Sequence, residues 1–564
     1  MTHLRIGTRT SQLALWQTEH VAAQLSAAWR DLTHELCHLV TQGDRRLDRA
    51  LPEIGGKGLF TAELEDALRD GTIDAAVHSL KDLPVEDADG LTVGAILRRA
   101  DARDVLVARR GVTLATLPPG AVVGTSSLRR QAQLLAIRPD IVVKPIRGNV
   151  DTRLRKVSAG EYDAAVMAAA GLVRLGLEDH IAEWLTEDVM LPAPGQGAIA
   201  VQCRAGDTET LKLLAAIDDA ATRLVVTAER RLLSRLGGGC SAPIAALASG
   251  GIGKPLRLIA RVVSVDGKRA TSTDVTASSS TEAADAAALD LFAQGAGGIL
   301  AERSKTPGPL RGKRIVITRP ADQVIDFASE LALEGATPLV MPVIQTAVVA
   351  DLGPVRATVA QSARFDWILF TSVNAVRYFF DLLPVEQAVY KAILGGTHVA
   401  AVGTATAACL EAMGVQVHVT PEKFTGVALA AAIPGLLGAR VLLPRSALGS
   451  AELPWRLAES GAEVTDLPIY TTVNAPLSAA DLAQLAEGVD AVTFTSGSTV
   501  RGLVEAVQAT PRAMAALTRA CIACIGPSTA SAVKELGLDV AVVAREHTVS
   551  GLIAGLRDYY RQRE

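Results

Sequence analysis

The sequence predicts a multidomain α/β protein, and three observations support this fold class. Short apolar runs alternate with helical patterns from end to end, as in IDAAVHS and GEYDAAVMA. That alternation is typical of parallel sheets covered by helices. The chain has 564 residues, which at roughly 100–200 residues per domain indicates several domains. The second half also repeats a set of its own motifs, so at least two of the domains are expected to be alike.

Composition excludes several classes of function. Apolar residues make up 49% and charged residues 21%, an ordinary globular balance. A net charge of −4 and 4% aromatic residues give no reason to expect nucleic acid or an acidic membrane as partner. The chain lacks an apolar stretch of ~18 residues and an N-terminal signal pattern. Its six cysteines are too scattered for a disulfide framework. We therefore expect a cytosolic protein.

The first candidate site residue follows a predicted strand. In IDAAVHSLKDLP the apolar run ends just before Lys81 and Asp82. Ligands of α/β sheets bind at the carboxyl ends of strands, which favours a functional carboxylate at Asp82. The alternative is that Asp82 is only a turn or capping residue. We interpret His78, inside the strand, as scaffold.

Basic residues follow at the starts of two predicted helices. GTSSLRRQAQL indicates a strand that ends at Thr125, Ser126 and Ser127, followed by a helix that carries Arg129 and Arg130. IRGNVDTRL repeats the arrangement with Arg147 and Arg153, and AGLVRLGL adds Arg174. Helix N-termini and arginine forks both suit carboxylates. The alternative is that these arginines are solvated or paired within the protein.

A small α+β domain is expected to close the first half. LRLIARVVSVDGKRATSTDV predicts a hairpin that turns at Asp266-Gly267, and an Ala-rich helix follows it. Cys240 precedes this hairpin in LGGGCSAPI. A buried structural cysteine is the commoner case, but three glycines leave the sulfur reachable, and a thiolate is a strong nucleophile. AERSKTPGPLRG is the expected linker to the second half.

The second half is an internal duplication. DWILFTSVNAVRYFFDLL is answered by DAVTFTSGSTVRGLVEAV, with Thr371 and Thr495 124 residues apart. Gly403 and Gly526 are 123 apart, and Gly312 and Gly438 are 126 apart. Matches at nearly one spacing predict two similar α/β lobes facing each other across a cleft. CIAC, at Cys521 and Cys524, has metal-ligand spacing but no second pair, so we expect buried thiols and no metal site.

GGKGLF, HSLKDLP, GTSSLRR, RGNVDTRL and GGGCSAP stand in that order between residue 1 and about 304. This half resembles the hydroxymethylbilane synthase (porphobilinogen deaminase) family. The resemblance implies that Cys240 carries a dipyrromethane cofactor through a thioether. It also implies that Asp82 stabilises the cation formed when porphobilinogen loses ammonia. The implied cofactor-binding residues are Lys81, Ser127, Arg129, Arg130 and Arg147. The implied substrate-binding residues are Arg9, Ser11, Lys57, Phe60, Thr125, Ser126, Arg153, Arg174 and Gln196.

Glu53 departs from the lysine that some relatives carry there. It puts one auxiliary carboxylate contact in doubt and no catalytic role.

The FTS motifs, IYTT and HTVSGL resemble uroporphyrinogen-III synthase across roughly residues 312–560. This resemblance implies that Tyr470 assists departure of a hydroxyl group. The implied donors to substrate carboxylates are Thr371, Ser372, Asn374, Arg445, Thr495, Ser496, Gly497 and Ser498. The alternative is that these hydroxyls merely cap helices. SALGSAEL also lacks an arginine found in some relatives, so carboxylate binding beside Arg445 stays open.

These resemblances imply two periplasmic-binding-protein-like α/β lobes, at 1–98 with a return segment about 194–220 and at 99–193. A small α+β domain at 221–304 and a linker at 305–311 follow. Two doubly wound lobes complete the chain, one at 312–347 and 474–564 and the other at 348–473.

The implied function is a bifunctional enzyme that converts four porphobilinogens into uroporphyrinogen III. Two alternatives remain at this point. The first half could be a two-lobed ligand-binding module like periplasmic receptors, and the second half could be a non-catalytic regulatory or scaffolding part.

Overall fold

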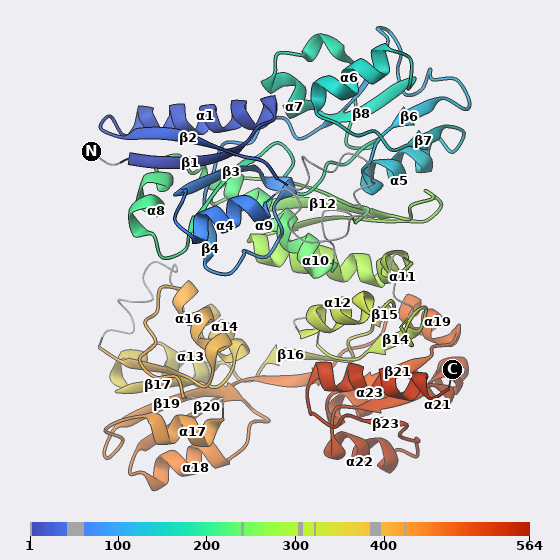
Figure 1. Cartoon of the computed structure of the whole chain (residues 1–564). Coiled ribbons are helices and arrows are strands. Elements are labelled where there is room, and N and C mark those ends of the chain that lie inside the picture. Colours follow the sequence, from blue (N-terminus) through green and yellow to red (C-terminus); the bar gives the residue numbers. More distant parts are fainter. Residues whose placement is uncertain are drawn as a thin grey trace. The chain divides into compact units, whose positions relative to one another are not determined.

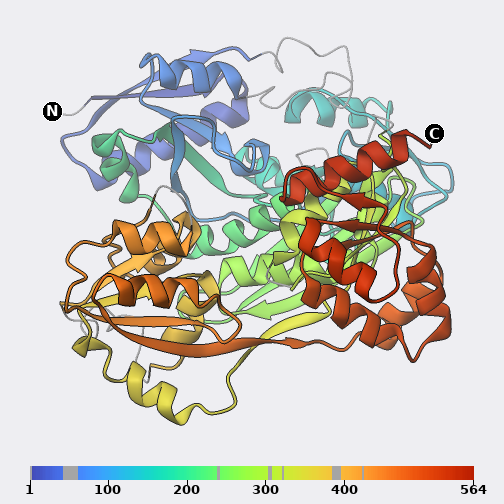
Figure 2. The same cartoon turned by 90° about the horizontal axis from the view of Figure 1, so that it is seen from below.

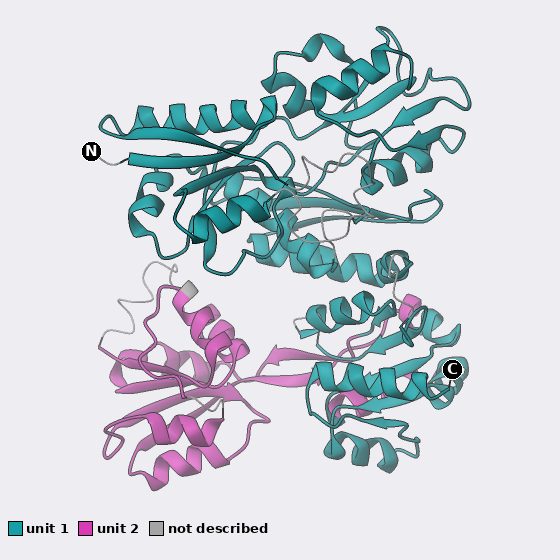
Figure 3. Ribbon diagram, viewed as in Figure 1, with its two compact units in different colours: residues 1–341, 482–497, 510–564 teal, residues 342–481, 498–509 magenta. Residues whose placement is uncertain are grey.

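The computed structural model describes residues 3–41, 61–237, 242–302, 308–320, 323–383, 396–421 and 425–563. These residues form two compact units (Figure 3). Unit 1 comprises residues 1–341, 482–497 and 510–564, and unit 2 comprises residues 342–481 and 498–509. Unit 1 holds four of the five sheets and unit 2 holds the fifth. The mixed α/β multidomain fold predicted from the sequence is confirmed (Figure 1).

The first sheet of unit 1 has the strand order β2-β1-β3-β10-β4. Its strands are β1 (His3–Arg9), β2 (Thr33–Leu39), β3 (Ala75–Ser79), β4 (Leu91–Ile96) and β10 (Ile199–Arg204). The accompanying helices are α1 (Gln12–Ala28), α4 (Ala62–Arg69) and α8 (Thr208–Ala215). Strands β1, β2 and β3 are parallel, whereas β10 runs antiparallel to both β3 and β4. The chain therefore leaves this sheet after β4 and returns to its interior as β10.

The second sheet is built from the intervening residues, in the order β7-β6-β8-β5-β9. Its strands are β5 (Asp104–Ala108), β6 (Val122–Gly124), β7 (Val142–Lys144), β8 (Ala164–Ala168) and β9 (Ile181–Trp184). The accompanying helices are α5 (Leu128–Ile137), α6 (Val150–Ser158) and α7 (Ala169–Arg174). At the return crossing, Ala100 N–H donates to Gly197 O at 3.1 Å. Gly197 has φ +89°, and a Cβ there would lie 2.7 Å from Ala100 O, so only glycine fits.

The third sheet is antiparallel and has the strand order β11-β12-β13. It contains β11 (Ile244–Ser249), β12 (Leu256–Val263) and β13 (Ala270–Ala277), with α9 (Ala220–Arg235), α10 (Ser280–Ala293) and α11 (Ala296–Ala301). The predicted hairpin is confirmed, because β12 pairs with β13 and Gly267 takes φ +77° in the turn. The Ala-rich helix is α10, which buries Ala283, Ala287 and Leu291. The sequence did not predict the third strand β11.

The fourth sheet is wholly parallel, in the order β15-β14-β21-β22-β23. Its strands are β14 (Arg314–Ile317), β15 (Thr337–Val340), β21 (Ala491–Phe494), β22 (Cys521–Cys524) and β23 (Val542–Val543). Its helices are α12 (Ile325–Leu333), α21 (Pro511–Arg519), α22 (Pro527–Glu535) and α23 (Val549–Arg561). Helix α23, red in Figures 1 and 2, packs against β22 and β23. CIAC is β22, and burial raises the pKa of both cysteine thiols to about 12.

The fifth sheet, in unit 2, has the order β16-β20-β19-β17-β18. Its strands are β16 (Ile344–Val348), β17 (Trp367–Phe370), β18 (His398–Ala401), β19 (Arg440–Ser446) and β20 (Glu463–Asn474). Its helices are α13 (Gly353–Val359), α14 (Val373–Asp381), α16 (Thr404–Ala412), α17 (Gly426–Ala432) and α18 (Glu452–Glu459). Helices α19 (Ala479–Ala486) and α20 (Gly497–Val507) cross the sequence boundaries between the units. Strand β16 is antiparallel to β20, and the other pairings are parallel.

The fourth and fifth sheets share a pair of hydrogen bonds at positions related by the sequence repeat. The carboxylate of Asp490 accepts the Arg314 N–H at 2.8 Å, and the Asp490 N–H donates to Arg314 O at 2.9 Å. Asp366 and Arg440 make the same two hydrogen bonds at 2.8 and 2.9 Å. Asp366 and Asp490 are 124 residues apart, which is the spacing of the FTS motifs. Each lobe therefore ties the starts of two neighbouring parallel strands together in the same way.

Within the described residues, none of the helices combines the length and the apolar character needed to cross a bilayer.

Candidate active sites

Asp82 lies at the carboxyl end of β3, as the sequence predicts. The strand passes directly into a 3-10 turn, η1 (Leu80–Asp82). The buried Leu80 anchors this turn, and its N–H donates to Ala198 O at 3.0 Å. The Arg230 guanidinium donates to Leu80 O and Leu83 O, both at 3.2 Å. The backbone around Asp82 is thus held from two sides, while its carboxylate is exposed.

Lys81 is bound to a glutamine from the return segment. Its Nζ donates to Gln196 Oε1 at 3.2 Å. Gln196 is fully buried, and its Nε2 donates to Asp104 Oδ1 at 2.9 Å and to Ala102 O at 2.7 Å. Burial and the nearby positive charge of Arg130 lower the pKa of Lys81 to about 8, against the opposing effect of Asp82. Lys81 therefore loses its proton, and with it the positive charge, at a pH only slightly above neutral.

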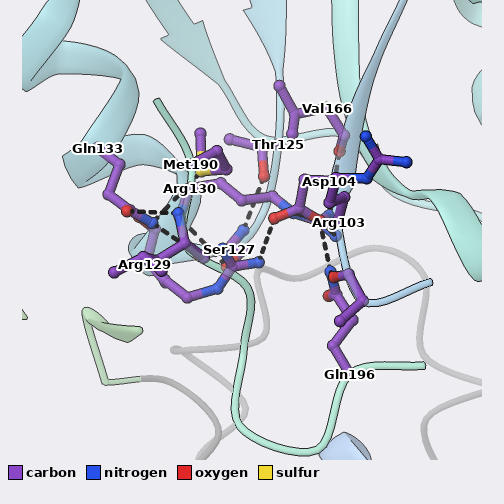
Figure 4. A network of polar contacts seen from close by, with 12 residues as sticks. Arg103, Asp104, Thr125, Ser127, Arg129, Arg130, Gln133, Val166, Met190 and Gln196 are labelled. Atoms are coloured by element: carbon purple, nitrogen blue, oxygen red, sulfur yellow. Dashed lines mark hydrogen bonds and ion pairs between the residues drawn. The ribbon is translucent and has the colours of Figure 1, made fainter. Parts of the chain in front are cut away.

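A buried carboxylate, Asp104, organises the arginines of the GTSSLRR motif (Figure 4). Arg129 Nη2 lies 2.8 Å from Asp104 Oδ2. Arg130 donates to Asp104 Oδ1 from Nη2 at 2.7 Å and from Nε at 3.2 Å. Burial alone would raise the pKa of Asp104, but Arg129 and Arg130 hold it well below its usual range. Asp104 is thus ionised at neutral pH and is shared between two buried guanidinium groups.

This network shows the pairing within the protein that the sequence left as the alternative for Arg129 and Arg130, and their binding of the cofactor stays a prediction. Both side chains are buried, and each also donates to a backbone carbonyl: Arg129 to Leu191 O at 2.5 Å and Arg130 to Val166 O at 3.0 Å. Much of their hydrogen-bonding capacity is therefore used inside the protein. Sequence reasoning missed Asp104, although one signal was present. It is the charged first residue of the apolar strand DVLVA.

The hydroxyl groups of this motif serve the local backbone. Ser127 caps α5, and its Oγ accepts the Arg130 N–H at 3.5 Å. Thr125 Oγ1 accepts the Ser127 N–H at 3.2 Å. Ser126 Oγ donates to Ile146 O at 2.8 Å. The strand-then-helix prediction for this motif is confirmed, and these hydrogen bonds fix the helix N-terminus relative to the neighbouring loop.

Arg153, from the motif RGNVDTRL, lies close to residues of HSLKDLP and GTSSLRR. Its Nε donates to Gly148 O at 2.8 Å. Burial and the positive charges of Arg130 and Arg147 lower its pKa to about 10, against the opposing effect of Asp82. Crowded cations stabilise one another's deprotonated forms, and a bound anion would relieve that repulsion. The motifs HSLKDLP, GTSSLRR and RGNVDTRL therefore meet in one basic region beside Asp82.

The other described cations among the predicted site residues of the first half are Arg174, which ends α7, and Arg9, which ends β1. Arg174 donates to Gly197 O at 2.7 Å, and burial lowers its pKa to about 10. Ser11 caps α1 by accepting the Ala14 N–H at 3.3 Å. Arg9 is half-buried close enough to His78 to add to the effect of burial, and together they lower the pKa of His78 to about 4. His78 is thus a neutral, buried residue, in keeping with its interpretation as scaffold.

Four residues of the sequence prediction, Glu53, Lys57, Phe60 and Cys240, lie outside the described residues. The described chain resumes at Thr61 and Ala242 on the far sides of these segments.

In unit 2, Tyr470 lies on β20 beside the first FTS motif. Its side chain is buried, and its hydroxyl is 3.0 Å from Ser372 Oγ. Ser372 also caps α14 by accepting the Ala375 N–H at 3.0 Å. The Tyr470 ring stacks on Tyr378 at 5.3 Å between centroids. Ser372 therefore caps a helix and contacts the candidate catalytic hydroxyl at once.

The other synthase candidates are distributed over both units. Thr371 and Asn374 flank Ser372 and are half-buried. Thr495, Ser496 and Gly497 follow β21 in unit 1, and Ser498 belongs to unit 2. Arg445 is not held ready for a ligand, because it donates twice to Asp466 at 2.6 Å and once to Ser450 O at 2.9 Å. A substrate carboxylate at Arg445 would have to compete with Asp466.

Comparison with known proteins now decides the family. The model of the porphobilinogen deaminase, dipyromethane cofactor binding domain matches residues 4–212, and that of the porphobilinogen deaminase C-terminal domain matches residues 223–291. A porphobilinogen deaminase from Brevibacillus brevis is 50% identical over 298 residues, 53% of this chain and 96% of that protein. The chain belongs to the porphobilinogen deaminase family. A second porphobilinogen deaminase, from Roseiflexus castenholzii, is 57% identical over 43% of this chain and 81% of that protein.

The second half matches a different family. The model of uroporphyrinogen-III synthase HemD covers residues 325–554. A solved structure of a mutant uroporphyrinogen III synthase from Thermus thermophilus is 24% identical, with a TM-score of 0.30, over 45% of this chain and 100% of that one. With a porphobilinogen deaminase and a uroporphyrinogen-III synthase in one chain, the protein is a bifunctional enzyme of tetrapyrrole biosynthesis. Its cofactor is a dipyrromethane attached to a cysteine.

The Asp104 network gives a stability prediction. Asp104→Asn removes the carboxylate from two buried arginines, and uncompensated buried charge costs about 3–5 kcal/mol. The free energy of the first unfolding transition, measured in urea, is expected to fall by that amount. Asp140→Asn is the control, because Asp140 pairs with Arg138 at the surface, where ion pairs contribute about 0–1 kcal/mol. Equal losses in both variants would contradict the account.

The lowered pKa of Lys81 gives a pH prediction. Lys81 is charged below pH about 8 and neutral above it, so we expect any binding of pyrrole carboxylates by Lys81 to weaken as pH rises through 8. We expect the rate at which cofactor-free enzyme captures pyrrole units, followed by intact mass, to decline there relative to Lys81→Arg. Arginine keeps its charge throughout, so taking this ratio removes the pH dependence of the attacking thiol. A ratio that stays flat from pH 7 to pH 9 (about one unit on either side of the pKa) would refute the assignment.

Proposed function

We propose that the first and second sheets of unit 1 are two periplasmic-binding-protein-like lobes that hold porphobilinogen and the cofactor between them. Lobe 1 comprises residues 1–98 with the return segment about 194–220, and lobe 2 comprises residues 99–193. Residues 221–304 form the small domain, whose Cys240 carries the dipyrromethane. One observation supports this proposal above the others: Asp82 lies with Lys81, Arg130, Arg147 and Arg153 in one basic region.

The residues of this region fit a carboxylate-rich cofactor. Each pyrrole unit carries an acetate and a propionate, so the growing chain accumulates negative charge. Lys81, Arg147 and Arg153 would bind those groups. Arg130 repels both Lys81 and Arg153, and Arg147 also repels Arg153, so bound anions would relieve this repulsion. Arg129 and Arg130, fixed by Asp104, would supply the surrounding positive field. The cofactor supplies the pyrrole carbon from which the product is extended.

Asp82 would carry out the charge stabilisation. Loss of ammonia from porphobilinogen generates a cation on the substrate, and an exposed carboxylate at the end of β3 stabilises it. Asp82 can also pass a proton to the departing amine. Its turn is anchored through Leu80 and Arg230, so little reorganisation is needed when charge develops. Gln196 orients Lys81 beside it.

In the second half we propose that Tyr470 donates a proton to the leaving hydroxyl of the linear tetrapyrrole. Ser372 orients the phenol through the 3.0 Å contact between the two oxygens. Thr371, Asn374, Thr495, Ser496, Gly497 and Ser498 would donate to substrate carboxylates from the two FTS motifs. Synthase lobe 1 would comprise residues 312–347 and 474–564, and lobe 2 residues 348–473. We expect a substrate carboxylate to bind Arg445 only by displacing Asp466.

The deciding experiment is an isomer assay on the full chain. The protein is incubated with porphobilinogen alone, the products are oxidised, and uroporphyrins I and III are resolved. Mostly isomer III is expected from the wild type. Tyr470→Phe keeps the ring stacked on Tyr378 and is expected to shift the product towards isomer I without slowing porphobilinogen consumption. Mostly isomer I from the wild type would overturn the proposal for the second half and leave that for the first half intact.

A further inference from the structure

The amino edges of the two duplicated sheets each carry a cavity, and residues at equivalent positions line part of both. In unit 2 a cavity of about 480 Å³ lies where β17, β18 and β19 begin, lined by Asp366, His398 and Arg440 among others. In unit 1 a cavity of about 430 Å³ lies where β14, β21 and β22 begin, lined by Asp490 and Cys521 among others. Both lie at the opposite ends of the strands from the FTS motifs. They are therefore separate from the proposed synthase site.

Only the cavity in unit 1 is rich in cations. Among the described residues that line it are three cations, Lys313, Arg519 and Arg563, and one carboxylate, Asp490. By the repeat spacings of 126 and 123 residues, Ala439 and Gly396 of unit 2 are the sequence equivalents of Lys313 and Arg519. Two of the three cations thus have no counterpart in the other copy of the lobe. We call the unit 1 cavity, formed by Lys313, Asp490, Arg519, Tyr560 and Arg563, the amino-edge cavity.

Two tyrosines of α23 hold the cations of this cavity in place. Tyr560 OH donates to Asp490 O at 2.8 Å, which ties the helix to the start of β21. Lys313 Nζ lies 4.8 Å from the centre of the Tyr560 ring and 3.4 Å from Asp490 Oδ1. The Arg563 guanidinium lies 3.9 Å from the centre of the Tyr559 ring. Each tyrosine ring already has a cation beside it. A ligand would therefore bind through the charge of the cations and not by stacking on these rings.

We propose that the amino-edge cavity binds a small multivalent anion, a phosphate or a polycarboxylate. Asp490 can balance one of the three cations, and Lys313 is the one within ion-pair distance of it. Within the described residues Arg519 and Arg563 have no ion-pair partner, and arginine forks suit both phosphate and carboxylate oxygens. The volume lies within the range of small-molecule sites. This site does not depend on either catalytic assignment.

The test is hydrogen–deuterium exchange of the full chain, read by mass spectrometry. Exchange is compared in inorganic phosphate, in citrate, and in chloride at the same ionic strength. In the wild type we expect peptides covering 309–314 and 556–563 to exchange about fivefold more slowly with phosphate, citrate or both than with chloride. Protection by phosphate alone would assign the site to phosphorylated ligands, and protection by citrate alone to polycarboxylates.

Matched variants separate the cavity from the rest of the surface. The triple variant Lys313→Gln, Arg519→Gln, Arg563→Gln is expected to lose the protection. The triple variant Arg512→Gln, Lys534→Gln, Arg545→Gln makes the same charge change at exposed positions outside the cavity and should keep it. Lys313→Ala with Arg519→Gly, which copies the unit 2 lobe, should also lose it, and it guards against misfolding of the first variant. No protection in the wild type, equal protection in chloride, or protection that survives in both cavity variants would overturn the proposal.

Discussion

Cys240→Ala is expected to abolish formation of the linear tetrapyrrole, with a loss of at least ~10³-fold in porphobilinogen consumption. On the proposed role of Cys240, this variant would lack the thiol that holds the covalent primer. Intact mass spectrometry should show the wild type heavier than its sequence by one dipyrromethane and the variant at the bare sequence mass.

Cys37→Ala is the matched control for this experiment. Cys37 is a half-buried cysteine of β2 in the same unit, and burial raises the pKa of its thiol. This variant should retain both the added mass and the activity. A fully active Cys240→Ala, or a cofactor mass that survives in it, would remove Cys240 from the mechanism.

Asp82→Asn is expected to lower porphobilinogen turnover by about 10²–10⁴-fold while leaving the melting temperature unchanged. The carboxylate is exposed at the end of β3, so its loss should not disturb packing. The amide keeps the size and hydrogen-bonding reach of the side chain but not the negative charge that we propose stabilises the substrate cation. The measurement is the single-turnover rate of ammonia release at saturating porphobilinogen.

Two variants bracket the Asp82 result. Asp82→Glu keeps the negative charge and should recover part of the rate. Recovery should be incomplete, because the extra methylene displaces the carboxylate. Asp89→Asn makes the same charge change at an exposed position seven residues away and should retain full activity. A rate for Asp82→Asn within about twofold of the wild type would be too small for a group that acts on the reacting atoms.

Features set by neighbouring residues could be predicted from the sequence. The strand before Asp82, the helix capped by Ser127 and the hairpin turn at Gly267 depend on local apolar patterns, capping hydroxyls and a positive φ. The duplication could also be predicted, because matching motifs recur in the sequence at a nearly constant spacing. The structure then explains part of that repetition, since Asp366 and Asp490 make equivalent backbone hydrogen bonds.

The pairing of charged groups could not be predicted in the same way. Asp104 meets Gln196, which is 92 residues away in the chain, and the sequence does not show that both are buried together. Arg129 and Arg130 carry the charge expected of carboxylate ligands, but their partner is a carboxylate of the protein itself. Arg445 is likewise paired with Asp466. Which partner an arginine finds depends on tertiary packing, which local patterns do not encode.

The position of β10 has a consequence for the order of folding during synthesis. This strand lies inside the first sheet, between β3 and the edge strand β4, yet it is made about 100 residues after β4. The second sheet, from β5 to β9, is continuous in the chain and can be completed before β10 leaves the ribosome. The first sheet therefore stays incomplete until β10 has been made, although most of its strands are synthesised first. The second sheet can fold as soon as β9 has been made. A nascent chain halted before residue 199 would expose the unpaired edges of β3 and β4, and a chaperone that binds strand edges would have its target there.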